Sequence, residues 1–145
     1  MSGFFDKADI TIQLPDKIIM EDTFDCTVNI NPRSDANLRK IEVELYCQET
    51  AISRGTTDCY YRKKVYSDER IPQQEVKMRA GFPIQIKERF QLPPMTTPTI
   101  QTTNHFVEWF VRIRLDVPWW PDTRKEEMLY VLPFIVNSEL AEEGR

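Results

Sequence analysis

The longest regular alternation of apolar and polar positions lies between residues 106 and 117. Its apolar members recur at every second position: Val107, Trp109, Val111, Ile113, Leu115 and Val117. A repeat of two residues is typical of a β-strand with one buried face, whereas a helix would scatter these residues around its circumference. Phe110 is the exception, because it falls on the face that is otherwise polar. The pattern predicts a strand whose outer face is polar except for one apolar residue.

A second strand is predicted from Met128 to Val136, and it is apolar on both faces. Between the two strands lies Pro118-Trp119-Trp120-Pro121, where pairing should lapse because proline cannot donate a ladder hydrogen bond. A doubly apolar strand is either covered on both sides or turns one side to a partner. We expect this hairpin to supply the largest single share of the core, since each buried Val, Leu, Ile or Phe contributes about 1.5–3 kcal/mol.

Shorter segments, most of them alternating, predict the rest of the fold. They fall at residues 8–14, 24–30, 41–48, 60–66 and 84–92, with a short edge strand at 74–78. Residues 50–58 are expected to form a polar loop, and residues 67–73 a turn-like connection. Seven or eight strands without an amphipathic helix indicate an all-β fold, an antiparallel β-sandwich. A closed barrel is the competing architecture, and the polar loops and proline breaks favour the sandwich.

One carboxylate interrupts the apolar pattern of these strands. Glu88 has the same strand parity as Ile84, Ile86 and Phe90, so it is expected to point toward the core. A lone buried carboxylate is costly, so it needs either a cationic partner or a bulge that turns it outward. Arg112 and Arg114 are candidate partners if their strand lies next to this one.

Length and charge bound the class of protein. With 145 residues, the chain is expected to form one domain over residues 1–137, followed by an acidic mobile tail at 138–145. The formal net charge of -4 argues against a general nucleic-acid binder, which needs a basic face. No apolar run approaches the roughly 20 residues of a membrane span. The amino terminus lacks the basic-then-apolar order of a signal peptide, so we expect a cytoplasmic protein whose three cysteines are reduced thiols.

Residues with catalytic or metal-binding chemistry are sparse. His105 is the only histidine, and no serine has a neighbouring histidine to activate it. Cys26, Cys47 and Cys59 lie too far apart for the usual zinc spacings. Strand parity places Cys26 and Cys47 on inward faces, where free cysteines behave as small hydrophobes, and leaves Cys59 at a loop edge. We therefore expect no enzymatic activity, no cofactor and no metal.

A strip of aromatic and basic side chains is the first candidate binding surface. It consists of Tyr60, Tyr61, Arg62, Lys63 and Lys64 and continues to Tyr66. Single-stranded nucleic acids use that mixture, because bases stack on rings while cations follow phosphates. Two other interpretations are a solvated strand face whose tyrosines cover the edge of the core, and a docking strip for an acidic protein. The acidic charge of the whole chain disfavours nucleic acid.

The pair Trp119 and Trp120 is the second candidate. Two indoles between prolines are either tucked over the open end of the sandwich or presented to a partner, since tryptophan is enriched at binding hot spots. Phe110 and the doubly apolar last strand together indicate an apolar patch, the seat of a missing second domain or of a second copy. A homodimer is therefore one hypothesis for the assembly.

The order of these segments resembles a known family. The most specific features are Phe90-Gln91-Leu92-Pro93-Pro94 and the later strand that ends in Arg114-Leu115-Asp116-Val117-Pro118. Residues 8–136 resemble the amino-terminal half of arrestin-like proteins, a group that includes arrestins, the retromer subunit of arrestin fold and bacterial sporulation-control proteins. The resemblance implies an immunoglobulin-like β-sandwich that binds other proteins without catalysis.

Two departures limit what this resemblance implies. Arrestins carry two such sandwiches in tandem, and this chain has room for one. Phosphate-sensing arrestins place a basic pair in the strand that corresponds to 128–136, where this chain has Leu132-Pro133. Phosphate sensing is therefore not expected. The sequence favours a cytosolic adaptor or scaffold with a protein partner, and the alternative is a ligand- or single-stranded nucleic-acid-binding domain that uses the strip at 60–66.

Overall fold

The structure, a computed structural model, describes residues 7–94 and 96–133. In these ranges the chain forms strands and no helix, and therefore no helix that could span a membrane. The strands are β1 (Ala8–Gln13), β2 (Lys17–Ile19), β3 (Thr23–Pro32), β4 (Ala36–Ser53), β5 (Cys59–Met78), β6 (Ile84–Gln91), β7 (Ile100–Gln101), β8 (His105–Asp116) and β9 (Thr123–Leu132). All but β2 and β7 have at least 6 residues, which confirms the predicted all-β class.

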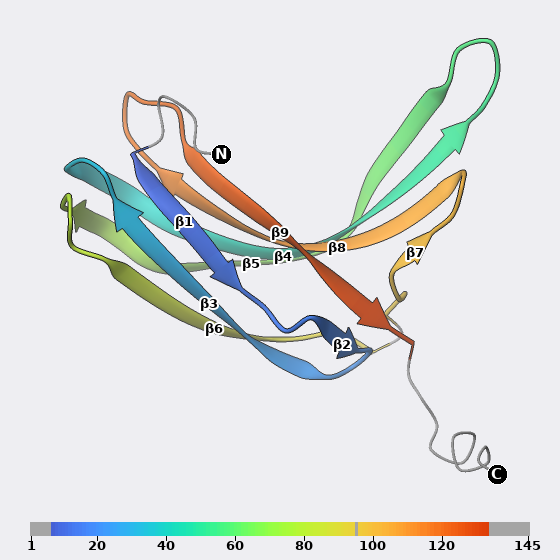
Figure 1. Cartoon of the computed structure of the whole chain (residues 1–145), viewed down its shortest axis with the longest axis horizontal. Coiled ribbons are helices and arrows are strands. Elements are labelled where there is room, and N and C mark those ends of the chain that lie inside the picture. The colour runs from blue at the N-terminus through green and yellow to red at the C-terminus, as the bar shows by residue number, and fades with distance from the viewer. Residues whose placement is uncertain (1–6, 95, 134–145) are drawn as a thin grey trace.

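The strands form a sandwich of two sheets (Figure 1). The small sheet has the order β1-β3-β6, and the large sheet has the order β2-β9-β8-β4-β5, with β7 also paired to β8. Two separate sheets exclude the closed barrel. The sandwich is antiparallel apart from β2, which runs parallel to β9, with Ile18 opposite Val131.

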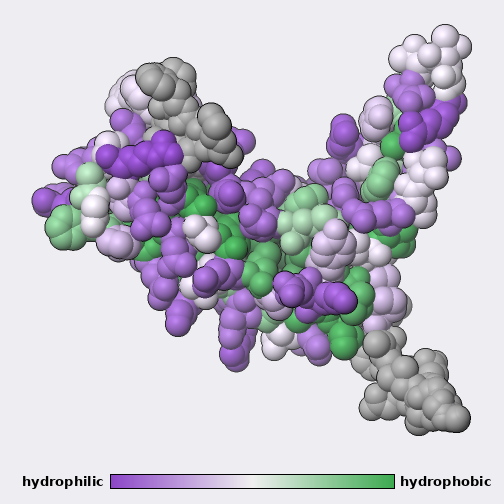
Figure 2. All heavy atoms as spheres, viewed as in Figure 1, coloured by the Kyte–Doolittle hydropathy of each residue, from purple (hydrophilic) through white to green (hydrophobic). Residues whose placement is uncertain are grey.

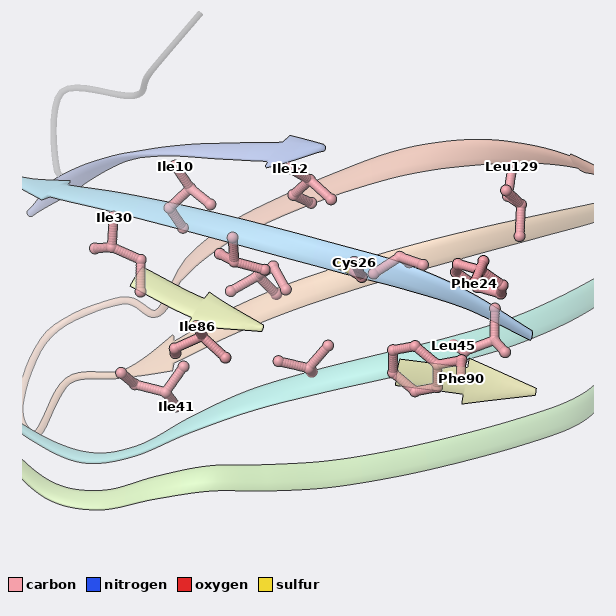
Figure 3. Close-up of a cluster of buried hydrophobic side chains, with 14 of the residues drawn as sticks. Ile10, Ile12, Phe24, Cys26, Ile30, Ile41, Leu45, Ile86, Phe90 and Leu129 are labelled. Carbon is pink, nitrogen blue, oxygen red and sulfur yellow. The ribbon is translucent and has the colours of Figure 1, made fainter. Parts of the chain in front are cut away.

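The core lies between the two sheets, as the side chains in Figure 3 show. The predicted inner face of β8 is confirmed, because every alternate residue from Val107 to Val117 is buried. From the small sheet, Phe24 and Phe90 stack with ring centroids 5.8 Å apart. Cys26 and Cys47 are buried and Cys59 is exposed, as strand parity predicts.

The β4–β5 hairpin is longer than predicted. β4 continues to Ser53, so the expected loop at 50–58 shrinks to residues 54–58. The expected turn at 67–73 is wrong, since β5 runs without a break from Cys59 to Met78. β5 is an edge strand that pairs only with β4, so its polar residues can face solvent. Pro72 lies beside a register shift between Ile41 and Val43, a position where a missing N–H is tolerated.

The last described strand differs from its prediction in extent and in exposure. β9 begins at Thr123 rather than Met128, and its charged residues pair across the ladder, with Glu126 opposite Arg112. Leu129 and Val131 are buried, whereas Tyr130 is 46% exposed, so only one face of this stretch belongs to the core. The remainder of the predicted strand up to Val136, and the predicted tail at 138–145, lie outside the described residues.

Glu88 points inward as its parity predicts, but neither Arg112 nor Arg114 is its partner. β6 pairs with β3 in continuous register through Glu88, so no bulge turns it outward. Arg70 of β5 reaches across the gap between the sheets, and its Nη1 donates to Glu88 Oε1 at 3.1 Å. The same guanidinium lies 4.2 Å from the centre of the Phe90 ring. Arg70 thus closes the open side of the sandwich, a contact between layers that sequence pattern does not reveal.

Candidate interaction surfaces

The free end of the β4–β5 hairpin extends beyond the sandwich, and we call residues 51–63 the arm. Figure 1 shows this hairpin bending away from the body, and Figure 2 shows that its surface is mainly hydrophilic. β8 accompanies β4 only as far as the pair Ala51–His105. Every residue of the arm is exposed except Ile52, which is half-buried. Among the described residues no second sheet covers the arm, so both of its faces are exposed there.

The arm holds most of the predicted aromatic and basic strip. Tyr60 and Tyr61 are 51% and 62% exposed. They point to opposite faces, because successive residues of a strand alternate. The guanidinium of Arg62 lies 5.2 Å from the centre of the Tyr60 ring, on the same face. Lys63 shares the other face with Tyr61 and lies opposite Glu49 of β4.

The tip of the arm is braced against a neighbouring loop. Arg54 Nη1 donates to Asp58 Oδ2 at 2.8 Å, and its Nη2 donates to the Thr103 carbonyl at 2.8 Å. The Nε of the same residue donates to Asn104 Oδ1 at 3.1 Å. A two-stranded ribbon is marginally stable by itself, so these contacts matter for its order. The arm is thereby held in one orientation before any partner arrives.

The root of the arm is fixed by a buried carboxylate. Glu44 is only 1% exposed on the outer face of the large sheet. Its carboxylate accepts hydrogen bonds from Lys64 Nζ at 2.7 Å, Ser67 Oγ at 2.6 Å and Arg112 Nη2 at 2.5 Å. Burial alone would raise the pKa of Glu44, but the Lys64 and Ser67 hydrogen bonds and the nearby charge of Arg112 outweigh it and lower that pKa. Lys64 of the predicted strip therefore belongs to the body rather than to the contact surface.

Phe110 lies in the same network and is half-buried. Its ring stacks on Tyr46 with centroids 5.3 Å apart, and the Tyr46 hydroxyl donates to Glu126. Arg112, two residues along β8, lies 5.5 Å from the Tyr46 ring. The apolar patch expected around Phe110 is therefore partly covered from within the chain.

The tryptophan pair lies at the end of the sandwich opposite the arm. Trp119 is 98% exposed, so the interpretation that it tucks over the sandwich is wrong. Trp120 is 41% exposed, and Lys7 Nζ lies 4.2 Å from the centre of its ring. A groove of about 400 Å³ beside the pair is lined by Lys7, Ala36, Asn37 and residues 117–120.

The only histidine, His105, places Nε2 2.7 Å from Glu49 Oε2 at the base of the arm. Within residues 7–94 and 96–133, no group of three or more His, Cys, Asp or Glu side chains could hold a metal ion.

One exposed aromatic was not singled out from the sequence, namely Phe82 in the β5–β6 turn, which is 67% exposed. A lone Phe after Gly81 has no pattern that distinguishes a solvent-facing turn position from a core position.

Comparison with known proteins identifies the fold. No protein-family model matches the chain, and no curated protein matches it in sequence. Among solved structures it is similar to Spo0M, the sporulation control protein from Bacillus subtilis, with a TM-score of 0.69 and 18% sequence identity. The match covers 96% of this chain. The chain has an arrestin-like fold. It spans 56% of the length of the Spo0M chain, so the likeness concerns one part of that protein.

Proposed function

We propose that the protein is a non-enzymatic protein-interaction module, a cytosolic adaptor that contacts its partner through the arm. The observation that carries this proposal is the exposure of Tyr60 and Tyr61, 51% and 62%, on a ribbon fixed at both tip and root. Tyrosine is enriched at protein interfaces because it buries a large area with few rotamers to freeze. A braced ribbon also loses little conformational entropy on binding.

The charge of the arm favours an acidic partner. Arg62 and Lys63 lie on opposite faces, so a cation accompanies a tyrosine on each face. A partner surface that places carboxylates beside apolar side chains would complement the cation and the tyrosine on either face. The regulatory role in the name of Spo0M, a sporulation control protein, fits an adaptor. Electrostatic complementarity of this kind raises association rates and selects among partners, and it weakens with salt.

Single-stranded nucleic acid is the second candidate partner. The exposed mixture of Tyr60, Tyr61 and Arg62 is the observation that favours it. Against it, the two rings point to opposite faces, whereas successive bases of one strand stack on rings of one surface. The net charge of -4 also opposes binding to phosphates.

Self-association through the outer face of the large sheet stays a prediction. The stacking of Phe110 on Tyr46 and the ion pair of Arg112 with Glu44 leave less apolar area there than the sequence suggested. Light scattering over a wide concentration range tests it. A dimer that is lost in Phe110→Glu, with the β-type circular dichroism spectrum retained, would support the homodimer. A monomer mass up to roughly 100 μM would exclude dimers more stable than about -5.5 kcal/mol.

Affinity capture with variants of the arm tests the proposed function. The bait is the full chain, compared with Tyr60→Ser/Tyr61→Ser and with the control Tyr130→Ser, an exposed tyrosine on the body. A protein captured by the wild type should then be purified and titrated. We expect the arm variant to lose about thirtyfold or more in affinity, the size of a hot-spot effect, and the control to bind as the wild type does.

Two outcomes would contradict the proposal. One is a partner that binds all three baits equally, which would place the contact elsewhere. The other is micromolar, salt-sensitive binding of short oligonucleotides in a filter assay that Arg62→Glu abolishes, which would favour nucleic acid.

A further inference from the structure

The β8–β9 turn holds an exposed indole in an unusual backbone conformation. The Trp120 N–H donates to the Val117 carbonyl at 3.3 Å, and Trp119 has a φ of 64°. Pro118 at the second position and a positive φ at the third are the features of a type II turn, in which the third residue is usually Gly or Asn. A bulky residue in this conformation is strained, because its side chain crowds the backbone. Since the Trp119 ring is 98% exposed, the fold gains nothing from it that offsets this strain.

A second aromatic tip lies at the same end of the sandwich. Phe82, 67% exposed, follows Gly81, whose φ of 83° shapes the β5–β6 turn. This turn is fixed to the β3–β4 connection, because the Gly81 N–H donates to the Pro32 carbonyl at 3.2 Å and the Ala80 N–H donates to Asp35 Oδ1 at 2.9 Å. Figure 1 shows the β3–β4, β5–β6 and β8–β9 connections together at the end opposite the arm. We call these three connections the Trp end.

Cations lie beside both aromatic tips. Lys7 covers the Trp120 ring, and Lys77 and Arg79 flank the β5–β6 turn, where neither forms an ion pair with any residue the structure describes. The residues that line the groove at the tryptophans and those that line the groove at Lys77 and Arg79 share Ala36 and Asn37, so the two features adjoin.

The acidic residues of the Trp end already have partners. Asp116 pairs with Arg39 at 3.5 Å, and Asp122 pairs with Arg114 at 3.2 Å. Asp35 accepts the backbone hydrogen bond that fixes the β5–β6 turn. Asp35 keeps its negative charge, because a backbone N–H does not neutralise a carboxylate. Among the described residues, Lys7, Lys77 and Arg79 outnumber it, so the net charge of this end is positive, although the chain as a whole carries -4.

We propose that the Trp end binds the surface of an anionic phospholipid membrane. Indole rings settle at the level of lipid headgroups, and lysine and arginine near the surface are attracted to anionic lipids. Protein hot spots instead form one contiguous cluster that is closed off from water. Here Trp119 and Phe82 lie on two separate turns at one end of the sandwich, an arrangement that a flat surface can meet at two points at once. The proposal concerns the end opposite the arm and does not depend on the proposed function.

Vesicle binding of the full chain tests this proposal. The probes are vesicles of equal parts phosphatidylcholine and phosphatidylglycerol, with vesicles of phosphatidylcholine alone for comparison. We expect co-sedimentation with the anionic vesicles only, weakened by salt and not displaced by inorganic phosphate. The tryptophan emission should shift to the blue, a change that reports on Trp119 and Trp120 because Trp109 is already buried at 2% exposure.

Variants separate the membrane contact from folding. Trp119→Gly should weaken binding about tenfold or more, since a large ring is no longer buried. It should also keep or raise the melting temperature, because glycine relieves the strained φ. Lys77→Glu and Arg79→Glu should each weaken binding at least about fivefold. The matched controls are Tyr61→Ser in the arm and Lys87→Glu on the body, and both should bind as the wild type does.

Several results would overturn the proposal. They are equal binding of wild type and Trp119→Gly, equal binding to neutral and anionic vesicles, displacement by inorganic phosphate, and no binding to either vesicle. A protein ligand that requires Trp119, in the absence of vesicle binding, would show that this end binds protein instead. The two proposals can be told apart by their variants. Binding of a protein partner at the arm depends on Tyr61 and not on Trp119, whereas vesicle binding depends on Trp119 and not on Tyr61.

Discussion

β4 and β5 run through both the body of the sandwich and the arm, yet their residues differ in burial between the two parts. In the body, Val43, Leu45 and Cys47 of β4 point inward and are at most 1% exposed. Ala51 and Ser53 continue the same parity into the arm and are exposed, because the small sheet does not reach that far. The alternation of a strand therefore shows which residues share a face, whereas a second layer decides whether that face is core. Side chains of the arm are free to serve contacts rather than stability.

The largest effect that would sharpen this comparison is expected at the root of the arm. Glu44→Ala removes the carboxylate that Lys64, Ser67 and Arg112 share. We expect a loss of about 3 kcal/mol in the free energy of unfolding, the low end for breaking a buried ion pair, because both cations are partly exposed. Urea denaturation measures it, and Glu49→Ala, whose side chain is 43% exposed, is the matched control. A loss no larger than that of the control would mean that the network does not hold the body together.

Acid should weaken the body through the same carboxylate. The pKa of Glu44 is lowered in the folded state from its usual 4.5, because hydrogen bonds from Lys64 and Ser67 and the charge of Arg112 outweigh burial. A lowered folded pKa gives stability that is present above the unfolded pKa and lost as the pH falls through the folded pKa. We expect Glu44→Gln to lack this part of the acid dependence, which appears as the pH falls below the usual 4.5, when urea midpoints are compared. Identical acid profiles for the two proteins would rule out Glu44 as a source of the dependence.

The reactivity of the three cysteines tests the difference in burial between body and arm without any mutation. Burial, with Glu88 and Glu49 nearby as smaller causes, raises the pKa values of Cys26 and Cys47 to about 12, so little thiolate is present at neutral pH. Cys59, at the start of β5 in the arm, is exposed. A thiol reagent should modify one cysteine quickly in the native protein and all three after denaturation. Rapid modification of three cysteines in native buffer would contradict the burial of the core.

The smallest effect on stability is expected from the tyrosines of the arm. Tyr60→Ser and Tyr61→Ser should each change the free energy of unfolding by less than about 0.5 kcal/mol, because exposed side chains contribute little to folding. Urea denaturation measures this as well. A loss above about 1 kcal/mol would show that the rings stabilise the hairpin and are not simply available to a partner.

Sequence pattern predicts the parts of this molecule in which local and global requirements agree. The strand around Trp109 and the burial of Cys26 and Cys47 follow from alternation alone, because one face of each strand meets the core. The continuous course of β5 was missed, since Ser67 to Arg70 are polar and Pro72 is turn-forming, and an edge strand tolerates both. The alternation does not show which strands become neighbours in the folded sheets.

The candidate surfaces depend on which strands are neighbours and in what register they pair. The Arg70–Glu88 contact joins two sheets whose pairing is not encoded in either segment. The tyrosines at 60 and 61 were identified as a candidate strip, but their division between two faces of an arm follows from the register with β4. The sequence left open whether Trp119 is tucked or exposed. Its orientation follows from the positive φ of the turn, which is unusual for tryptophan and which sequence pattern does not indicate.

The central claim, that the arm is a protein-binding surface, is tested most directly by crosslinking in living source cells. A photoreactive amino acid replaces Tyr61 in one variant and Gln85, an exposed residue of β6 on the body, in another. We predict that position 61 forms a covalent adduct with one defined protein, that Arg62→Glu in the same chain removes most of it, and that position 85 yields none. The same adduct at both positions, or adducts at position 61 with nucleic acid alone, would contradict the claim.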